Sequence, residues 1–419
     1  MTTKKNGASL LIFMGWLVYT LSYLGKLNYS ANITQIIDHY GITKSEAGLV
    51  PTFFFFSYGV GQVVNGLLCK KYNIKWMIFG SLIISGIINF VIALGCDFSL
   101  IKWLWMINGF SLSILWPTIV RLMSESLPKK DLSRSSVILG TTVAAGTLII
   151  YGCSSVFAIF HGFKYAFYLA AFADLGISLY WILFYQKAVS MSLEGKETST
   201  VQDEKKEEGV KSSSAKGIFS VVIPILCFCA IGVNLIKDGL TTWVPSILKE
   251  EYSLTDSLSI LLTLLLPIVA IFGNAFALKM HKRIFDYITH CALVFGVMAI
   301  IILMIIGSLS MKNVFIMLFG LITVNLLASS LNSLVTSIFP MFMREKINSG
   351  MFAGVLNGFC YVGSTISSYG LGVIAEHFGW NSVFWVLLGF CVIVAIIWVG
   401  YKGYKTRVFG KEDNIKMFS

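Results

Sequence analysis

The sequence predicts an all-α membrane protein whose twelve spanning helices form two related bundles of six. Three observations support this fold class: an apolar composition, twelve apolar runs of spanning length, and a repeat that relates the two halves. Of 419 residues, 56% are hydrophobic and 13% are charged, and the mean hydropathy is +0.78. A soluble core stops growing at about 250 to 300 residues, so most of this apolar surface must face the lipid bilayer.

The apolar runs set the predicted helices, because a bilayer core of about 30 Å needs about 20 helical residues. They lie near 8–38, 44–69, 76–96, 99–127, 132–160, 163–186, 217–248, 254–280, 285–308, 312–340, 345–376 and 380–402. The interruption between the sixth and seventh runs carries six basic and six acidic residues. We therefore expect an N-terminal bundle over 1–186, a cytoplasmic linker over 187–216, and a C-terminal bundle with its tail over 217–419.

The basic residues predict the orientation. If both termini are cytoplasmic, the inside loops and tails hold 24 of the 32 Lys and Arg, and the outside loops hold five. Cytoplasmic loops are enriched in Lys and Arg in this way. We therefore expect a multi-pass protein of the cytoplasmic (inner) membrane with both termini inside. The net charge of +11 is explained by this bias, and we expect no nucleic-acid partner.

The two halves of the chain resemble each other at two landmarks. YGITKSEAG at Tyr40 lies 212 positions before YSLTDSLSI at Tyr252, and HGFKYAF lies 217 positions before FGWNSVF. Thr43 and Thr255 stand in the first pair where a helix needs an N-cap oxygen. Two parallel six-helix repeats form a known transporter layout, with the binding site near the midplane between them.

Three basic residues fall inside predicted spans: Lys26, Arg121 and Lys237. A charge within a span is costly, so each is a functional candidate. Lys26 precedes Tyr40 by 14 residues and Lys237 precedes Tyr252 by 15. The two lysines therefore occupy equivalent depths in the two halves.

Polar groups share a helix face with each lysine. At spacings of three and four residues, they are Tyr19, Tyr23 and Ser30 around Lys26, and Asn234 and Thr241 around Lys237. Two cations flanked by hydrogen-bonding groups suit a small anionic substrate. In two glycine-rich spans, Gln62, Asn357 and Tyr361 are further candidates to face the pore.

A structural interpretation competes with this one. Each lysine would then neutralise a carboxylate, and the candidates are Asp174 and Asp238. Asp238 is next to Lys237 and about 100° round the helix, which we expect to be poor geometry for a direct pair. Arg121 has Glu125 four residues later, so an ion pair is as good an interpretation as ligand contact.

Signatures of catalysis and of cofactor binding are missing from the sequence. It contains no GxxxxGK[ST], GxSxG or HExxH motif, and its eight cysteines follow no metal or disulfide spacing. We expect no enzymatic activity, no cofactor and no metal. Transport without a nucleotide motif would be secondary rather than ATP-driven.

Four stretches carry a resemblance to a known family: YTLSYLGKLNYSAN, LWPTIVRLM, NLIKDGLTTWVPSILKEEYSL and GFCYVGSTISSYGLGVIAEHFGW. They resemble the major facilitator superfamily, and within it the organophosphate:inorganic phosphate antiporters, which include glycerol-3-phosphate and hexose-phosphate transporters. The resemblance runs through most of the chain and implies the major facilitator fold, with a phosphorylated sugar or polyol as substrate and exchange for phosphate as one mode.

The resemblance also implies roles for single residues. The family's two phosphate-gripping arginines match Lys26 and Lys237. Its pore-lining aromatic residues match Tyr19, Tyr23, Trp116 and Tyr361. A lysine on the family's second helix appears here as Gln62, and the other departures are Leu27, Lys70 and Val143.

The sequence therefore predicts a monomeric secondary transporter of a small organic anion that works by alternating access, with the anion between Lys26 and Lys237. Two alternatives remain open. One is a proton- or sodium-coupled carboxylate transporter in which Asp174 or Asp238 titrates. The other is a transporter-like membrane sensor of sugar phosphate, which would bind tightly with little flux.

Overall fold

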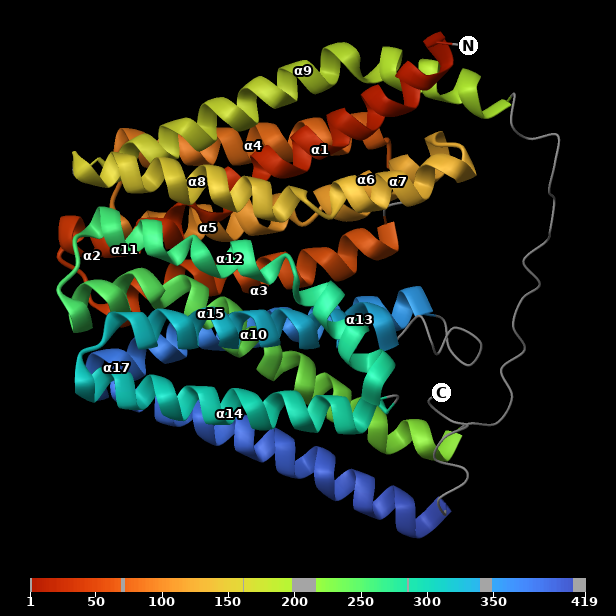
Figure 1. The fold of residues 1–419 in the computed structure, drawn as a ribbon. Helices are drawn as coiled ribbons and strands as arrows, with labels where there is room; N and C mark the ends of the chain where they lie inside the picture. Colours follow the sequence, from red (N-terminus) through yellow and green to blue (C-terminus); the bar gives the residue numbers. More distant parts are fainter. Residues whose placement is uncertain are drawn as a thin grey trace. The chain divides into compact units, whose positions relative to one another are not determined.

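The computed structural model describes residues 2–68, 72–160, 162–197, 216–284, 286–339 and 349–409. This part of the chain is helical and contains no strand (Figure 1). The helices before the linker are α1 (Thr2–Ala31), α2 (Ile33–Tyr40), α3 (Lys44–Leu68), α4 (Ile74–Leu94), α5 (Phe98–Leu112), α6 (Leu115–Ser126), α7 (Lys129–Leu139), α8 (Thr142–Ile159) and α9 (Phe163–Glu197). Those after it are α10 (Lys216–Tyr252), α11 (Asp256–Thr263), α12 (Leu265–Ala270), α13 (Gly273–Ile284), α14 (Tyr287–Met311), α15 (Val314–Ser333), the π-helix η2 (Leu334–Ile338) and α17 (Ser349–Phe409).

The described residues contain 11 ranges that are long and apolar enough to cross a membrane. The last, Gly354–Gly403, is 50 residues long, which is enough for two spans. Gly379 divides it, because its φ of 76° and ψ of 170° are not helical. The prediction of twelve spans is confirmed, and the protein is a multi-pass membrane protein.

Two predicted helices are interrupted where proline removes a backbone donor. Pro117 has no N–H for the carbonyl of Ser113, and the helix divides there into α5 and α6. Pro267 acts in the same way on Thr263, which is the last residue of α11. The break at Pro117 leaves a backbone carbonyl available to a neighbouring helix.

The chain forms two compact units. Unit 1 comprises the described residues of Met1–Ile36 and Phe53–Gly209, and unit 2 comprises those of Ile37–Thr52 and Val210–Ser419. Residues 37–52, the end of α2 and the first turns of α3, therefore belong to unit 2. The three-part division at 187–216 stays a prediction.

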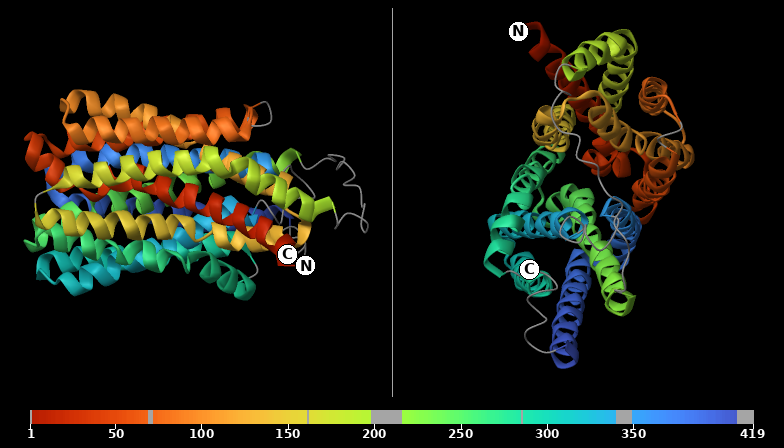
Figure 2. Two further views of the ribbon diagram at one scale, coloured as in Figure 1. Left: turned by 90° about the horizontal axis from the view of Figure 1, so that it is seen from above. Right: turned by 90° about the vertical axis from the view of Figure 1, so that its right-hand side faces the viewer.

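Each unit is a bundle of long helices that run side by side. In unit 1, α1 packs against α8 and α9, and α9 also packs against α4. In unit 2, α10 packs against α15 and α17, and α14 packs against α17. The right-hand view of Figure 2 looks along many of these helices.

The two repeated threonines cap their helices as expected. The Thr43 hydroxyl accepts from the Glu46 N–H at 3.2 Å, while the Glu46 carboxylate accepts from the Thr43 N–H at 2.9 Å. This is a capping box. The Thr255 hydroxyl accepts from the Leu258 N–H at 3.3 Å. The local structure at both positions agrees with the internal repeat.

Candidate functional site

The ammonium group of Lys26 lies among aromatic rings of unit 1. Its Nζ is 4.1 Å from the ring centroid of Tyr58, 5.0 Å from that of Tyr23 and 5.9 Å from that of Phe54. The negative face of each ring attracts a cation at such distances. Lys26 is half-buried, so the rings hold a positive charge partway along α1 while its side chain remains accessible.

The other predicted aromatic residues of unit 1 continue this cluster. The rings of Tyr19 and Tyr23 are 5.4 Å apart, and Tyr19 lies 4.9 Å from Trp116 on α6. Four predicted site residues are thus linked by contacts, from Trp116 through the two tyrosines to Lys26. The arrangement offers phenol hydroxyls and ring faces next to one cation.

On α3 the structure adds residues that the sequence analysis missed. Tyr58 and Phe54 contact Lys26, whereas the predicted Gln62 donates from Nε2 to the Ser113 carbonyl at 3.5 Å. That carbonyl is the one that Pro117 leaves available. The missed signal was spacing, because positions 54, 58 and 62 repeat every four residues and share a face.

Lys237 of unit 2 has a different environment. Its Nζ lies 3.7 Å from Oδ1 of Asp238. Oδ2 of Asp238 accepts from the Ser364 hydroxyl at 2.6 Å and from the Asn234 amide at 3.3 Å. The geometry expected of adjacent positions was poor for a direct pair, and the separation of 3.7 Å is too long for a hydrogen bond, although the long lysine side chain brings its ammonium within ion-pair distance of Asp238.

The remaining predicted residues of unit 2 lie on α10 and α17. Asn234 is 6% exposed, and in the described part of the chain its Oδ1 has no hydrogen-bond partner. The Thr241 hydroxyl donates to the Lys237 carbonyl at 2.8 Å, within its own helix. Asn357 and Tyr361 are half-buried, and Ser364, which was missed, follows Tyr361 by three residues and so shares its face.

Asp174 does not neutralise Lys26. It is completely buried, its Oδ2 accepts from the Ser85 hydroxyl at 2.6 Å, and its Oδ1 has no hydrogen-bond partner among the described residues. The carboxyl group packs on Gly25, where an added Cβ would lie 2.6 Å from Oδ2. Consecutive helical residues point about 100° apart, so the carboxyl lies beside the α1 backbone on the Gly25 face.

Arg121, the third basic residue within a predicted span, pairs with Glu125, as the spacing of four residues indicated. Nε of Arg121 lies 2.7 Å from the Glu125 carboxylate. Its Nη1 also donates to the Tyr72 carbonyl at 3.0 Å. The i,i+4 ion pair is confirmed.

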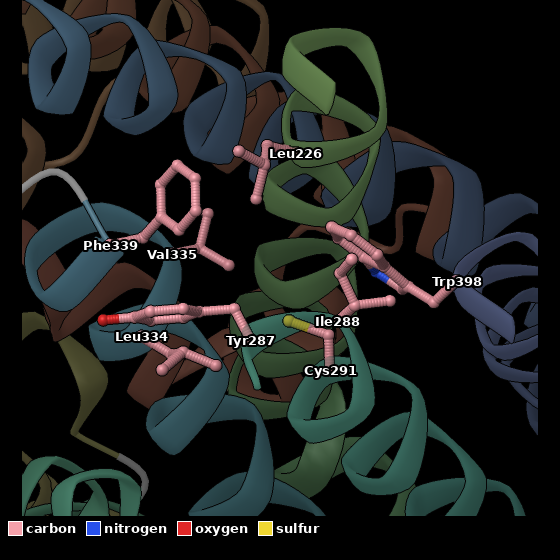
Figure 3. Close-up of a pocket in the computed structure, with 8 residues that line it drawn as sticks. All are labelled: Leu226, Tyr287, Ile288, Cys291, Leu334, Val335, Phe339 and Trp398. Atoms are coloured by element: carbon pink, nitrogen blue, oxygen red, sulfur yellow. The ribbon is translucent and has the colours of Figure 1, made fainter. Parts of the chain in front are cut away.

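An apolar cavity in unit 2 holds none of the predicted site residues (Figure 3). It is lined by Leu226, Tyr287, Ile288, Cys291, Leu334, Val335, Phe339 and Trp398. Its free volume of about 10 Å³ is the size needed for one water molecule. Figure 3 shows the Tyr287 hydroxyl on the side away from Trp398. The cavity is too small for an organic substrate.

Comparison with known proteins identifies a family and several relatives. The sequence model of the Major Facilitator Superfamily matches residues 15–353. A probable hexose phosphate transport protein of Chlamydia muridarum is 21% identical over 420 residues, covering 90% of this chain and 87% of that protein. Sugar phosphate exchanger 3 of Homo sapiens is 22% identical over 404 residues, covering 83% and 78%.

A further relative is the membrane sensor protein UhpC of Escherichia coli, which is 22% identical over 237 residues. This match covers 54% of each chain, so it spans about half the length of the sensor. Among solved structures, a bacterial homologue of the human lysosomal transporter Spinster superimposes with a TM-score of 0.73 at 13% identity, over 94% of this chain and 97% of that one. At this identity the likeness shows the fold.

Proposed function

Because the chain belongs to the Major Facilitator Superfamily, we propose that it is a secondary transporter that moves a phosphorylated sugar or polyol across the cytoplasmic membrane by alternating access. The relatives named for hexose phosphate and sugar phosphate support this substrate class. In this proposal the protein acts as a monomer within the lipid bilayer, with both termini in the cytoplasm. It has no enzymatic step.

The observation that carries the proposal is the cation of Lys26 within a ring-lined cluster. A phosphate ester is a small anion with a polyhydroxyl body. We propose that Lys26 and Lys237 each bind its phosphate, that Tyr19, Tyr23, Trp116 and Tyr361 contact the sugar, and that Gln62, Asn234, Thr241 and Asn357 offer it hydrogen bonds. Lysine binds phosphate as a point charge, so this site would select the charge of the anion more strongly than the arrangement of its oxygen atoms.

Exchange is the proposed mode of transport. Purified protein in vesicles should take up labelled glucose 6-phosphate faster when the vesicles are preloaded with inorganic phosphate or unlabelled ester. Collapse of the proton gradient should matter little. Uptake that stops with an uncoupler and ignores internal anion would instead favour the proton-coupled carboxylate transporter, with Asp174 and Asp238 as the next residues to neutralise.

A sensor is the second candidate function, and the match to the sensor protein favours it. A sensor would bind glucose 6-phosphate tightly and move little of it. Parallel measurement of binding to purified protein and of uptake into vesicles separates the two functions. Binding without exchange would identify the sensor.

The proposed orientation has its own test. In a background without native cysteines, single cysteines near Lys102 or Lys249 should react with an impermeant thiol reagent added to intact cells. A cysteine at Lys205 should react only after the cells are opened. Labelling at Lys205 from outside would overturn the topology.

A further inference from the structure

Unit 1 contains a hollow near the start of α1 that the proposed site does not use. Its volume is about 320 Å³, within the range of pockets that hold small molecules. It is lined by residues of α1 and α7, which are Ser9, Ile12, Phe13, Trp16, Arg134 and Ile138. Its one charged lining residue is Arg134, so the hollow favours an anion.

Arg134 supplies a group that suits phosphate. The side chain is exposed, and its Nη1 donates to the Ser9 hydroxyl at 3.2 Å, which orients the guanidinium at the wall of the hollow. A guanidinium presents five N–H donors in a planar fork. Such a fork can bind two phosphate oxygens at once.

Aromatic rings form another part of the wall. Phe13 and Trp16 stack with ring centroids 6.3 Å apart and planes 10° apart. The indole N–H of Trp16 donates to the Thr141 hydroxyl at 2.9 Å, which fixes the orientation of its ring. Flat apolar rings beside a charged fork match a sugar phosphate, which has apolar C–H faces and an ionised end.

The hollow and Lys26 lie on adjoining faces of α1, and a run of side chains leads from one to the other. Positions 9, 12, 16, 19, 23 and 26 follow spacings of three and four residues, which place successive side chains next to one another. Trp16 is ten residues from Lys26, which is about 15 Å along the helix axis. The rings of Trp16, Tyr19 and Tyr23 therefore lie in sequence along α1 between the Arg134 end of the helix and Lys26.

We propose that this hollow is a second subsite for the phosphate ester, in which Arg134 binds the phosphate and the Phe13 and Trp16 rings bind the sugar. The inference rests on the proposed function and deepens it. On the predicted topology the hollow lies towards the cytoplasm, so it is where the ester binds before it reaches Lys26 and after it leaves. Its role is to raise the local concentration of substrate at that end of α1.

Arg134→Gln tests the subsite. Equilibrium binding of glucose 6-phosphate to the purified protein, and its exchange in vesicles of neutral phosphatidylcholine, should both shift to about fivefold higher concentration, the upper end for an exposed ion pair. The maximal rate should change less than the KM. The KM of Arg134→Lys should lie between that of the wild type and that of Arg134→Gln, because lysine keeps the charge and loses the planar fork.

Lys75→Gln is the matched control. It removes one positive charge at the start of α4, in the same unit, from a residue that does not line the hollow. It should leave the KM unchanged. A KM rise in this variant equal to that of Arg134→Gln would show a general effect of charge and overturn the subsite.

The remaining outcomes separate the subsite from the transport function. An Arg134→Gln protein that unfolds at the wild-type temperature and keeps the wild-type KM overturns the subsite and leaves the proposed function intact. A wild-type protein that neither binds nor exchanges any phosphate ester overturns both. An effect of Arg134→Gln that appears only in vesicles containing anionic phosphatidylglycerol would assign the hollow to a lipid headgroup, and would also overturn the subsite.

Discussion

The two repeat-related lysines lie in environments of opposite character. In unit 1 the Lys26 ammonium lies over the rings of Tyr58, Tyr23 and Phe54. In unit 2 the Lys237 ammonium lies 3.7 Å from the carboxylate of Asp238. Aromatic faces stabilise a cation and leave its formal charge in place, whereas a carboxylate offsets it.

This difference shows that an internal repeat can conserve the position of a charge without conserving its partner. Asp238 is itself held by Ser364 and Asn234, so it stays beside Lys237 as a fixed counter-charge. Lys26 should therefore contribute more to anion binding than Lys237. The two lysines are equivalent in the sequence repeat and unequal in their charged neighbours.

Lys26→Gln should have the largest effect. It removes the cation and keeps much of the side-chain volume, so binding of glucose 6-phosphate should weaken by about 1.5 to 3 kcal/mol, the scale of a charged hydrogen bond. The unfolding temperature should stay constant or rise, because a costly cation has left the span. Binding calorimetry and thermal unfolding measure the two effects, with Lys102→Gln as a control of equal charge. Normal affinity in Lys26→Gln would remove this residue from the site.

Lys237→Gln should weaken binding less, by about 1 kcal/mol, because the adjacent carboxylate already offsets part of its charge. If its main role were structural, the change would strand Asp238 and destabilise the empty protein by about 3 to 5 kcal/mol. Adding Asp238→Asn would then restore stability. A binding loss as large as that of Lys26→Gln would show that the two lysines are equal after all.

Tyr58→Leu tests the aromatic side of the comparison. Loss of the ring nearest Lys26 should weaken anion binding by about 0.5 to 1 kcal/mol, the strength of one cation–π contact, because the ammonium is then less well positioned. Tyr58→Phe keeps the ring and should bind normally. Equal losses in both variants, read by the same calorimetry, would assign the effect to the hydroxyl group instead.

Arginine at both lysine positions should have the smallest effect and the opposite sign. The planar fork can engage two phosphate oxygens, so the Lys26→Arg, Lys237→Arg double variant should bind glucose 6-phosphate tighter by about 0.5 kcal/mol, a modest share of a charged hydrogen bond. A singly charged carboxylate of similar size should gain less, and competition binding would show the ratio. An equal gain for both anions would argue against phosphate as the recognised group.

The fold was predictable because the sequence features that specify it are local. Apolar runs, basic loops and threonine caps each depend on a few neighbouring residues, and the twelve spans and both caps are present in the structure. The breaks after α5 and α11 also trace to single residues, Pro117 and Pro267. Such local causes can be read without knowing how the helices pack.

The site was predictable in part, and the limit is physical. Helical spacing identified Tyr19, Tyr23 and Lys26 on one face, and their contacts within unit 1 agree with it. Spacing to Gln62 and Tyr361 could have pointed to Tyr58 and Ser364. Only packing shows that Tyr58 contacts Lys26 and that Ser364 contacts Asp238. Asp238 was a candidate partner of Lys237 from the sequence, but its approach to 3.7 Å could not be predicted, since the 100° rule describes Cβ directions and a lysine is long enough to fold back.

Gly379 has a consequence for the surface of the protein. It is the one non-helical residue between the last two spans, with a φ of 76° that L-residues rarely adopt. A turn this short offers proteases no extended strand and antibodies no loop. Tags and cleavage sites placed there would have to break helical backbone hydrogen bonds, so the turn between the last two spans is a poor place for an insertion. A protease added on that side of the membrane should leave the turn intact.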